Sequence, residues 1–126
     1  MPTIAFLANL STAEHKRRWD LLNKHAGDGV NVVVADPTGS PGELIEALKD
    51  ADAAVPWLAS IPLDIAEHLP KLKLVQLLTA GYDSVDVIGL GKLGISVANN
   101  GGSNAISVSE HAVSLMRNVY RRMMEA

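Results

Sequence analysis

Short apolar runs alternate with amphipathic stretches along the whole chain. The first run, IAFLA at residues 4–8, is continuously apolar, which is typical of a strand buried on both faces of a parallel sheet. Similar runs follow at residues 30–35, 53–58, 72–78 and 95–98. Their length and composition predict five strands.

The intervals between these runs have the pattern of helices. Thr12 can cap a helix that ends near Gly27 and turns Trp19, Leu21 and Leu22 inward. A second helix opens at Pro41, since proline suits the first helical position. Further helices are predicted at residues 62–69 and from about residue 104 to the C-terminus.

Alternating strands and helices at this spacing predict right-handed βαβ units and a parallel sheet covered on both faces. Five strands in 126 residues indicate a flavodoxin-like doubly wound α/β fold with strand order 2-1-3-4-5. Ligands of such sheets bind beyond the carboxyl ends of the strands. The segments expected at that edge are residues 8–11, 57–60, 79–83 and 99–104.

Composition narrows the class of protein. Hydrophobic residues make up 48% and charged residues 20%, as in an ordinary globular domain. The absence of cysteine excludes disulfides and thiolate chemistry, and a net charge of −3 without a basic stripe argues against nucleic acid. No apolar run is long enough to cross a membrane, and residues 1–3 carry no signal-peptide features, so a cytoplasmic protein is expected.

Residues 89–94, GLGKLG, match the dinucleotide pattern G-x-G-x-x-G, and Glu110 lies 21 residues beyond Gly89. A dinucleotide site needs a buried strand before the motif and a helix that opens on it, so that the helix N-terminus faces the pyrophosphate. Here a loop or weak helix precedes the motif and a short β-branched run follows it. We interpret the match as incidental and expect the glycines to form the return from a helix to the fifth strand.

Several motifs follow one another in the second half of the chain. An apolar strand leads into TAGYDSVD at residues 79–86, GISVAN follows at 94–99, and NAISVSEH at 104–111. This order resembles the D-isomer-specific 2-hydroxyacid dehydrogenase family, which includes formate, glycerate and phosphoglycerate dehydrogenases; Ser109 stands where the family usually has alanine. The resemblance is close over roughly the last 55 residues. In the remainder only the order of the predicted strands and helices agrees.

The resemblance implies a carboxylate site at the end of the fourth strand. In the family, backbone N–H groups of a small residue and a glycine bind the substrate carboxylate, and the matching residues here are Ala80 and Gly81. Paired N–H donors at a strand end do suit an anion, and glycine permits close approach. The alternative is that Gly81 only shapes a turn.

Two further substrate contacts are implied by the resemblance. Asn104 matches an asparagine that contacts substrate through its amide, although an asparagine at this place could also cap the following helix. Trp57, Leu58 and Ala59 match the loop that closes over the substrate. Trp57 could instead be an ordinary core residue, because tryptophan is mostly buried.

The resemblance places catalysis outside this chain. In the family, the catalytic His, its Glu partner and a substrate-binding Arg lie in a Rossmann domain that binds NAD or NADP. We expect that domain to be absent here, so that the chain has no catalytic residue, binds no cofactor or metal, and is inactive alone. A structural role is predicted for His111, because it does not face its neighbour Glu110. The remaining histidines lack metal-ligand spacing: His15, His25 and His68.

The last predicted helix carries more apolar surface than one sheet face can absorb. Its stripe is formed by Val108, Ala112, Leu115, Val119 and Met123, and is widened by Val113, Met116, Tyr120 and Met124. A capping box is predicted at Ser107 and Glu110. We divide the chain into a flavodoxin-like substrate-binding domain, residues 1–103, and an inter-domain or dimerisation helix, residues 104–126. A homodimer through residues 105–124 is expected, with exchange of the helix as one route.

Two hypotheses from other classes stay open. A stand-alone flavodoxin-like binding or regulatory domain of the receiver type needs acidic residues after the first and third strands, where this chain has Asn9 and Trp57. Flavin binding is disfavoured, because residues 9–12 are a poor phosphate loop. The fold could also serve purely as a dimerising partner.

The favoured function is the substrate-binding domain of an NAD(P)-dependent D-2-hydroxyacid dehydrogenase. Such an enzyme transfers hydride between nicotinamide and a 2-hydroxy or 2-oxo acid. The expected partners are that small acid, the cofactor domain and a second copy of the chain, with neither nucleic acid nor a membrane.

Overall fold

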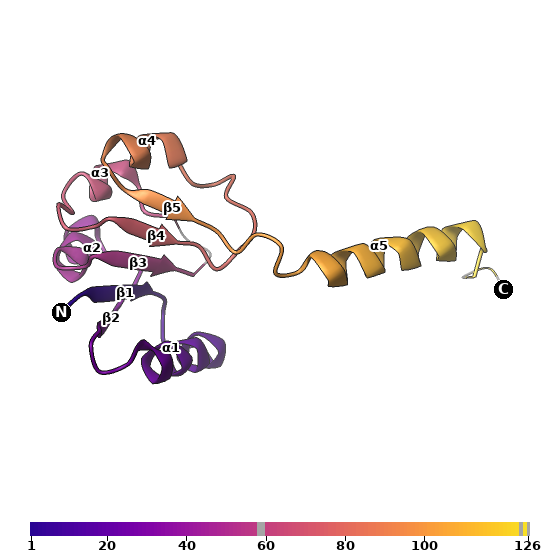
Figure 1. The fold of residues 1–126 in the computed structure, drawn as a ribbon, viewed down its shortest axis with the longest axis horizontal. Coiled ribbons are helices and arrows are strands. Elements are labelled where there is room, and N and C mark those ends of the chain that lie inside the picture. The colour runs from indigo at the N-terminus through magenta and orange to yellow at the C-terminus, as the bar shows by residue number, and fades with distance from the viewer. Residues whose placement is uncertain (58–59, 124, 126) are drawn as a thin grey trace.

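The computed structural model describes residues 1–57, 60–123 and 125 and shows a five-stranded sheet with helices around it (Figure 1). The strands are β1 (Thr3–Leu7), β2 (Asn31–Ala35), β3 (Ala53–Pro56), β4 (Leu74–Gln76) and β5 (Ser96–Ala98). The helices are α1 (Ala13–Ala26), α2 (Pro41–Leu48), α3 (Leu63–Ala66), α4 (Val87–Lys92) and α5 (Ala105–Tyr120).

All strands of the sheet are parallel and lie in the order β2-β1-β3-β4-β5. The predicted flavodoxin-like topology is therefore confirmed. β1 occupies an interior position, with Ile4 opposite Val32 of β2 and Ala53 of β3. Because every strand runs the same way, all the strand ends that could hold a ligand gather at one edge.

Local signals account for the first two helices. The Thr12 hydroxyl accepts the N–H of His15 at 3.3 Å, and Gly27 ends α1 with a φ of 74°. Ser40 and Glu43 form a reciprocal capping box at α2, which also has a proline in its first turn. The sequence analysis identified the proline but not this box.

The capping box predicted at the last helix is wrong. α5 begins at Ala105, so Ser107 and Glu110 already lie inside the helix. The Ser109 hydroxyl donates to the Ile106 carbonyl at 2.8 Å, a bond within the helix rather than at its end. The chain reaches helical geometry one turn earlier than the S-x-x-E pattern indicates.

The core lies between the sheet and the layer of α2, α3 and α4. Its largest fully buried side chains include Leu48, Leu72, Val75 and Leu90. Burial of these apolar side chains is the main force that holds the two layers together.

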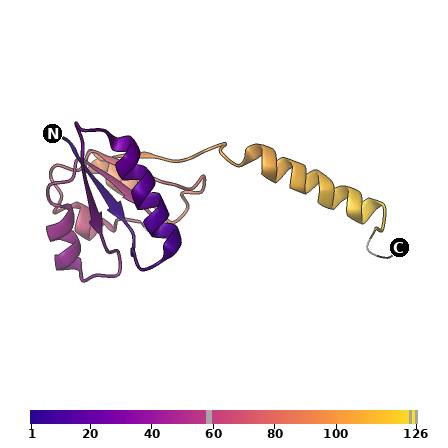
Figure 2. The same cartoon turned by 90° about the horizontal axis from the view of Figure 1, so that it is seen from below.

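The opposite face of the sheet is covered by α1 next to β1 and β2 (Figure 2). Phe6 stacks on Trp19 with the ring centroids 6.3 Å apart, and Leu22, one turn later, is half-buried. The prediction that Leu21 also faces inward is wrong, because this side chain is 45% exposed. Leu21 lies at the margin of α1 beside Arg18, where it borders an open hollow instead of being buried against the sheet.

α5 extends away from the sheet, beyond the carboxyl ends of the strands (Figures 1 and 2). Its large apolar side chains are exposed: Ile106, Val108, Val113, Leu115, Met116, Val119 and Tyr120. Of the predicted stripe, Val108, Ala112, Leu115 and Val119 lie in α5, Met123 lies beyond the end of the helix, and Met124 lies outside the described residues. The apolar face of α5 itself is open. None of the helices in the described part of the chain is long and apolar enough to cross a membrane.

Candidate functional site

The loop that follows β4 is anchored to the end of β5 through its carbonyl groups. The Asn99 amide donates to the Ala80 carbonyl at 2.7 Å, and the Thr79 hydroxyl donates to the Gly81 carbonyl at 2.8 Å. The Asn100 N–H donates to the Thr79 carbonyl at 3.0 Å. These bonds hold the peptide planes of the loop. The partners of its backbone N–H groups are therefore the next question.

Neither the Ala80 N–H nor the Gly81 N–H donates to an acceptor within residues 1–57, 60–123 and 125. Both residues are solvent-accessible, so the two donors can reach a ligand. Consecutive N–H groups in a fixed loop attract an anion such as a carboxylate. The two donors are thus arranged so that an anion could bind there, and the predicted carboxylate site remains a prediction.

The turn itself does not require glycine at position 81. The φ of Gly81 lies outside the left-handed region, and a Cβ added there would meet only Asp83 Oδ2, at the ordinary distance of 3.6 Å. The alternative that Gly81 only shapes a turn is therefore weakened. The absence of a side chain at residue 81 therefore leaves open space there.

Asn104 occupies the N-cap position of α5, yet its side chain makes no capping hydrogen bond. The helix uses only its backbone carbonyl, which accepts the Val108 N–H at 2.9 Å. The amide is exposed and not used by the helix. Capping therefore does not explain why asparagine stands here, and the predicted substrate contact remains a prediction.

Trp57 follows β3 at the same edge of the sheet. Its N–H donates to the Leu7 carbonyl at 3.0 Å, and its side chain is half-buried rather than part of the core. The alternative that Trp57 is an ordinary core residue is therefore not supported. The other two residues of the predicted substrate loop, Leu58 and Ala59, lie outside the described residues.

Two side chains of α1 that the sequence did not indicate as site residues flank Trp57. The guanidinium carbon of Arg18 lies 4.1 Å from the centre of the indole, and the His15 ring meets the same indole edge-on at 5.5 Å. His15 Nδ1 is 2.6 Å from the Asn9 carbonyl oxygen, so this nitrogen donates when it is protonated. The spacing of three residues along α1 was the only signal in the sequence, because it puts both side chains on one face.

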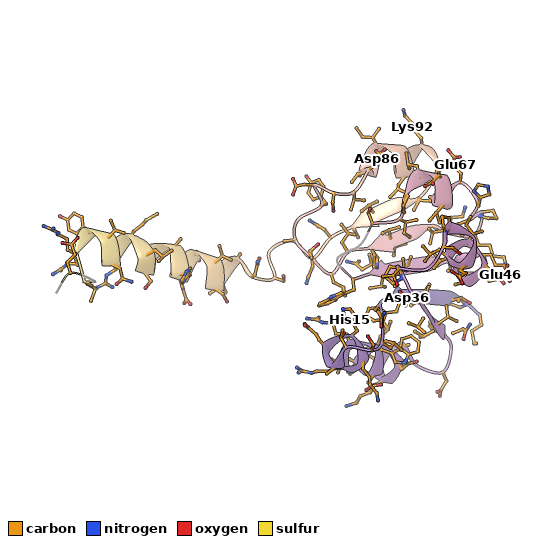
Figure 3. All side chains as sticks on the ribbon, turned by 180° about the vertical axis from the view of Figure 1, so that it is seen from behind. His15, Asp36, Glu46, Glu67, Asp86 and Lys92 are labelled. Atoms are coloured by element: carbon orange, nitrogen blue, oxygen red, sulfur yellow. The ribbon has the colours of Figure 1, made fainter. Side chains whose placement is uncertain are left out.

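An ionised carboxylate lies at the end of β2. The Thr38 hydroxyl and N–H both donate to Asp36, and these bonds hold the pKa of that carboxyl below its usual value. Asn9 Nδ2 also donates to Asp36, at 3.2 Å. Figure 3 shows His15 and Asp36 toward α1, whereas Asp86 and Lys92 lie on the opposite side of the molecule.

The glycine motif at residues 89–94 does not fit a dinucleotide. Gly89 lies inside α4, where its N–H already donates to Asp86 and an added Cβ would be 2.5 Å from a Leu63 methyl carbon. β5 follows the motif, so no helix opens onto it. The expected return to β5 is made by Gly94 alone, with a φ of 76°, while Gly89 and Gly91 are helical.

No group of three acidic or histidine side chains in the described part of the chain is arranged to hold a metal ion. The candidate site therefore consists of hydrogen-bond donors at the strand ends. Its centre is the pair of N–H groups at Ala80 and Gly81, with Asn104 after β5 and Trp57 after β3.

Comparison with known proteins identifies the family. The family model for the D-isomer specific 2-hydroxyacid dehydrogenase catalytic domain matches residues 5–126. The chain therefore belongs to this family. The match includes the first 70 or so residues, which the sequence motifs covered only in layout.

Individual relatives agree with this assignment. The chain is 33% identical to a glyoxylate reductase of Thermococcus litoralis over 93 residues, or 72% of this chain and 28% of that protein. It is 37% identical to a glyoxylate reductase of Korarchaeum cryptofilum over 84 residues, 66% of this chain and 25% of that protein.

A solved structure has the same fold. The NAD-dependent formate dehydrogenase from Staphylococcus aureus, in complex with NAD, is 25% identical with a TM-score of 0.72, covering 99% of this chain and 40% of that one. The chain thus spans from a quarter to two fifths of the length of the proteins it matches.

Proposed function

We propose that these residues form the substrate-side domain of an NAD(P)-dependent D-2-hydroxyacid dehydrogenase and bind a 2-hydroxy or 2-oxo acid by its carboxylate. The observation that carries the proposal is that the N–H groups of Ala80 and Gly81 have no acceptor among the described residues, while the loop's carbonyl groups are held by hydrogen bonds. The Asn104 amide is the proposed donor or acceptor for a second oxygen of the acid. Residues 57–59 form the proposed cover.

Preorganisation is the main contribution of this domain to catalysis. Because Asn99 and Thr79 fix the loop before the acid arrives, little ordering is left for the binding step. The substrate carbon is then held in one orientation for hydride transfer, which is the chemistry that a bound nicotinamide supplies. We assign no acid or base role to His111, which lies exposed on α5.

Residues 89–94, the glycine motif of the described residues, do not form a site for a dinucleotide. We therefore assign cofactor binding to residues outside this chain. Support comes from the greater length of the relatives and from the NAD bound in the staphylococcal formate dehydrogenase. The 126-residue chain alone is expected to show no turnover of glyoxylate with NADH or NADPH, measured by nicotinamide absorbance. A measurable reductase activity that copurifies with the chain would contradict this assignment.

Carboxylate binding itself can be tested by calorimetry with glycolate. Glycolamide, which replaces the carboxylate by an uncharged amide, is the matched control ligand. Glycolate is expected to bind and glycolamide to bind at least about 10-fold more weakly, because charge-assisted hydrogen bonds are roughly twice as strong as neutral ones. Equal affinity for the two ligands would contradict an anion site.

The loop of residues 79–81, here called the carboxylate loop, is proposed to be held in position by Asn99. Asn99 itself is not proposed to contact the acid. Asn99→Ala removes the bond to the Ala80 carbonyl and is expected to weaken glycolate binding about 5-fold, since one such bond is worth about 1 kcal/mol. Asn100→Ala is the control, because only the backbone N–H of that residue holds the loop. An unchanged affinity in Asn99→Ala would show that the loop does not depend on this bond.

We also propose that two copies of the chain associate through residues 105–124. The support is the open apolar face of α5, which is larger than the scattered apolar residues of a monomer surface. A closed symmetric pair would bury this face in both copies at once. In this proposal residues 1–103 bind the acid and residues 104–126 form the inter-domain and dimerisation helix.

A further inference from the structure

A positively charged side chain contacts Trp57, one of the residues of the proposed substrate site, and is not part of the loop of residues 79–81. Arg18 projects from α1 over the indole of Trp57, with its guanidinium carbon 4.1 Å from the ring centre, within the range of a cation–π contact. Trp57 is the first residue after β3, in the segment proposed to cover the acid. The stacking therefore holds a cation beside the cover of the site.

The surroundings of Arg18 extend to the start of the carboxylate loop. Arg18, Val55 and Leu78 line one open hollow of about 250 Å³ between α1 and the sheet. Leu78 immediately precedes the loop of Thr79, Ala80 and Gly81. The remaining lining is apolar: Phe6, Leu21 and Leu22. The hollow that ends at Leu78, next to the loop in the sequence, is thus lined by apolar side chains and one cation.

The charge of Arg18 is available to a ligand. Its only ionic partner among the described residues is Glu14, at 3.3 Å, and both side chains are substantially exposed, 44% and 63%. Exposed pairs of this kind contribute little and are readily exchanged. Its guanidinium presents a planar fork of donors that matches a carboxylate. One arginine beside a glutamate suits a singly charged carboxylate better than a doubly charged phosphate.

We propose that Arg18 is a specificity-determining residue, which selects 2-oxo or 2-hydroxy acids that carry a second carboxylate at the end remote from the first. This inference rests on the proposed function, because the first carboxylate is placed at Ala80 and Gly81. Trp57 fixes the direction of the guanidinium and the apolar lining of the hollow accommodates the carbon chain between the two carboxylates.

The test compares two ligands that differ in one group. 2-Oxoglutarate and 2-oxovalerate have chains of equal length and differ in the terminal carboxylate or methyl group. Calorimetry on the 126-residue chain is expected to show about 10-fold tighter binding of 2-oxoglutarate. In Arg18→Gln the preference should fall to about 2-fold or less, with the affinity for 2-oxovalerate unchanged.

Three further variants sharpen the test. Arg17→Gln removes the same charge from the adjacent position on α1, which faces a different surface hollow, and should leave the preference intact. Arg18→Lys keeps the charge but loses the planar fork and should retain only part of the preference. Glu14→Gln frees the guanidinium and should strengthen 2-oxoglutarate binding.

The outcomes separate this inference from the function on which it rests. Equal binding of both ligands by the wild-type chain, or a preference that survives in Arg18→Gln, overturns the role of Arg18 and leaves the carboxylate site standing. Binding of neither ligand overturns both proposals. Circular dichroism checks that the variants keep the wild-type fold, as expected for a partly exposed helix residue.

Discussion

Gly81→Ala is expected to weaken binding of a 2-hydroxy or 2-oxo acid at least about 10-fold without unfolding the chain. The carboxylate must approach the N–H groups of Ala80 and Gly81 to within about 3 Å, and a methyl group on residue 81 would occupy space beside both donors. The loop itself should tolerate the methyl group, because the backbone is not left-handed there and the nearest atom, Asp83 Oδ2, would be 3.6 Å away.

Stability and binding should therefore change independently in this variant. Alanine restricts the unfolded chain, so the free energy of unfolding is expected to stay equal or rise by up to about 1 kcal/mol. Gly91→Ala is the matched control, since an added Cβ there meets nothing within 4 Å and the residue lies in α4 away from the site. Denaturant unfolding and glycolate calorimetry on both variants give the comparison. Wild-type affinity in Gly81→Ala would mean that the acid does not bind at this loop.

A second large effect is expected on association. Replacing Leu115 and Val119 of α5 by glutamate should weaken the proposed homodimer at least about 100-fold, because each change puts a charge on an apolar interface. Val119 is 79% exposed and Leu115 50%, so neither change disturbs the core. Light scattering over a range of protein concentrations measures the result.

The control for association adds the same charges to the other side of the helix. Ser107 and Ser114 are seven residues apart, two turns of α5, and fall opposite the apolar stripe. Their double replacement by glutamate should leave the dimer unchanged. A wild-type chain that remains a monomer at high concentration would contradict the proposed dimer directly.

The fold was predictable because its determinants are local. Continuous apolar runs and helical periodicity specify the strands and helices, and the handedness of βαβ units then leaves few possible orders of the sheet. The wrong predictions concern sequence patterns that are compatible with two local structures. S-x-x-E at Ser107 can begin a helix or lie within one, and the apolar character of Leu21 did not decide which face of α1 it takes.

The site was predictable only in part. Ala80 and Gly81 were identified because they fall in a contiguous motif of the sequence. The supporting contacts are not local: Asn99 reaches Ala80 from another strand, and Arg18 stacks on Trp57 from another element. Nothing in the spacing of such residues along the chain indicates that they meet, so these contacts required the structure.

The glycine motif at residues 89–94 also shows what the sequence can and cannot establish. The dinucleotide interpretation could be rejected from the sequence, because no strand directly precedes the motif and no helix directly follows it. The sequence did not explain why residue 89 is glycine. The structure supplies the reason: α3 and α4 approach so closely that a Cβ on Gly89 would be 2.5 Å from Leu63. A side chain at this position would therefore meet both Leu63 and the Asp86 carboxylate that caps α4.

The most direct test of the account is the response of individual backbone amides to a bound acid. Nuclear magnetic resonance of the 15N-labelled chain, titrated with glycolate, follows the N–H groups of Ala80 and Gly81 separately. Both signals are expected to shift downfield and to saturate together, with larger changes than other amides and little response to glycolamide. Signals at these two residues that stay fixed while glycolate binds elsewhere, or does not bind, would contradict it.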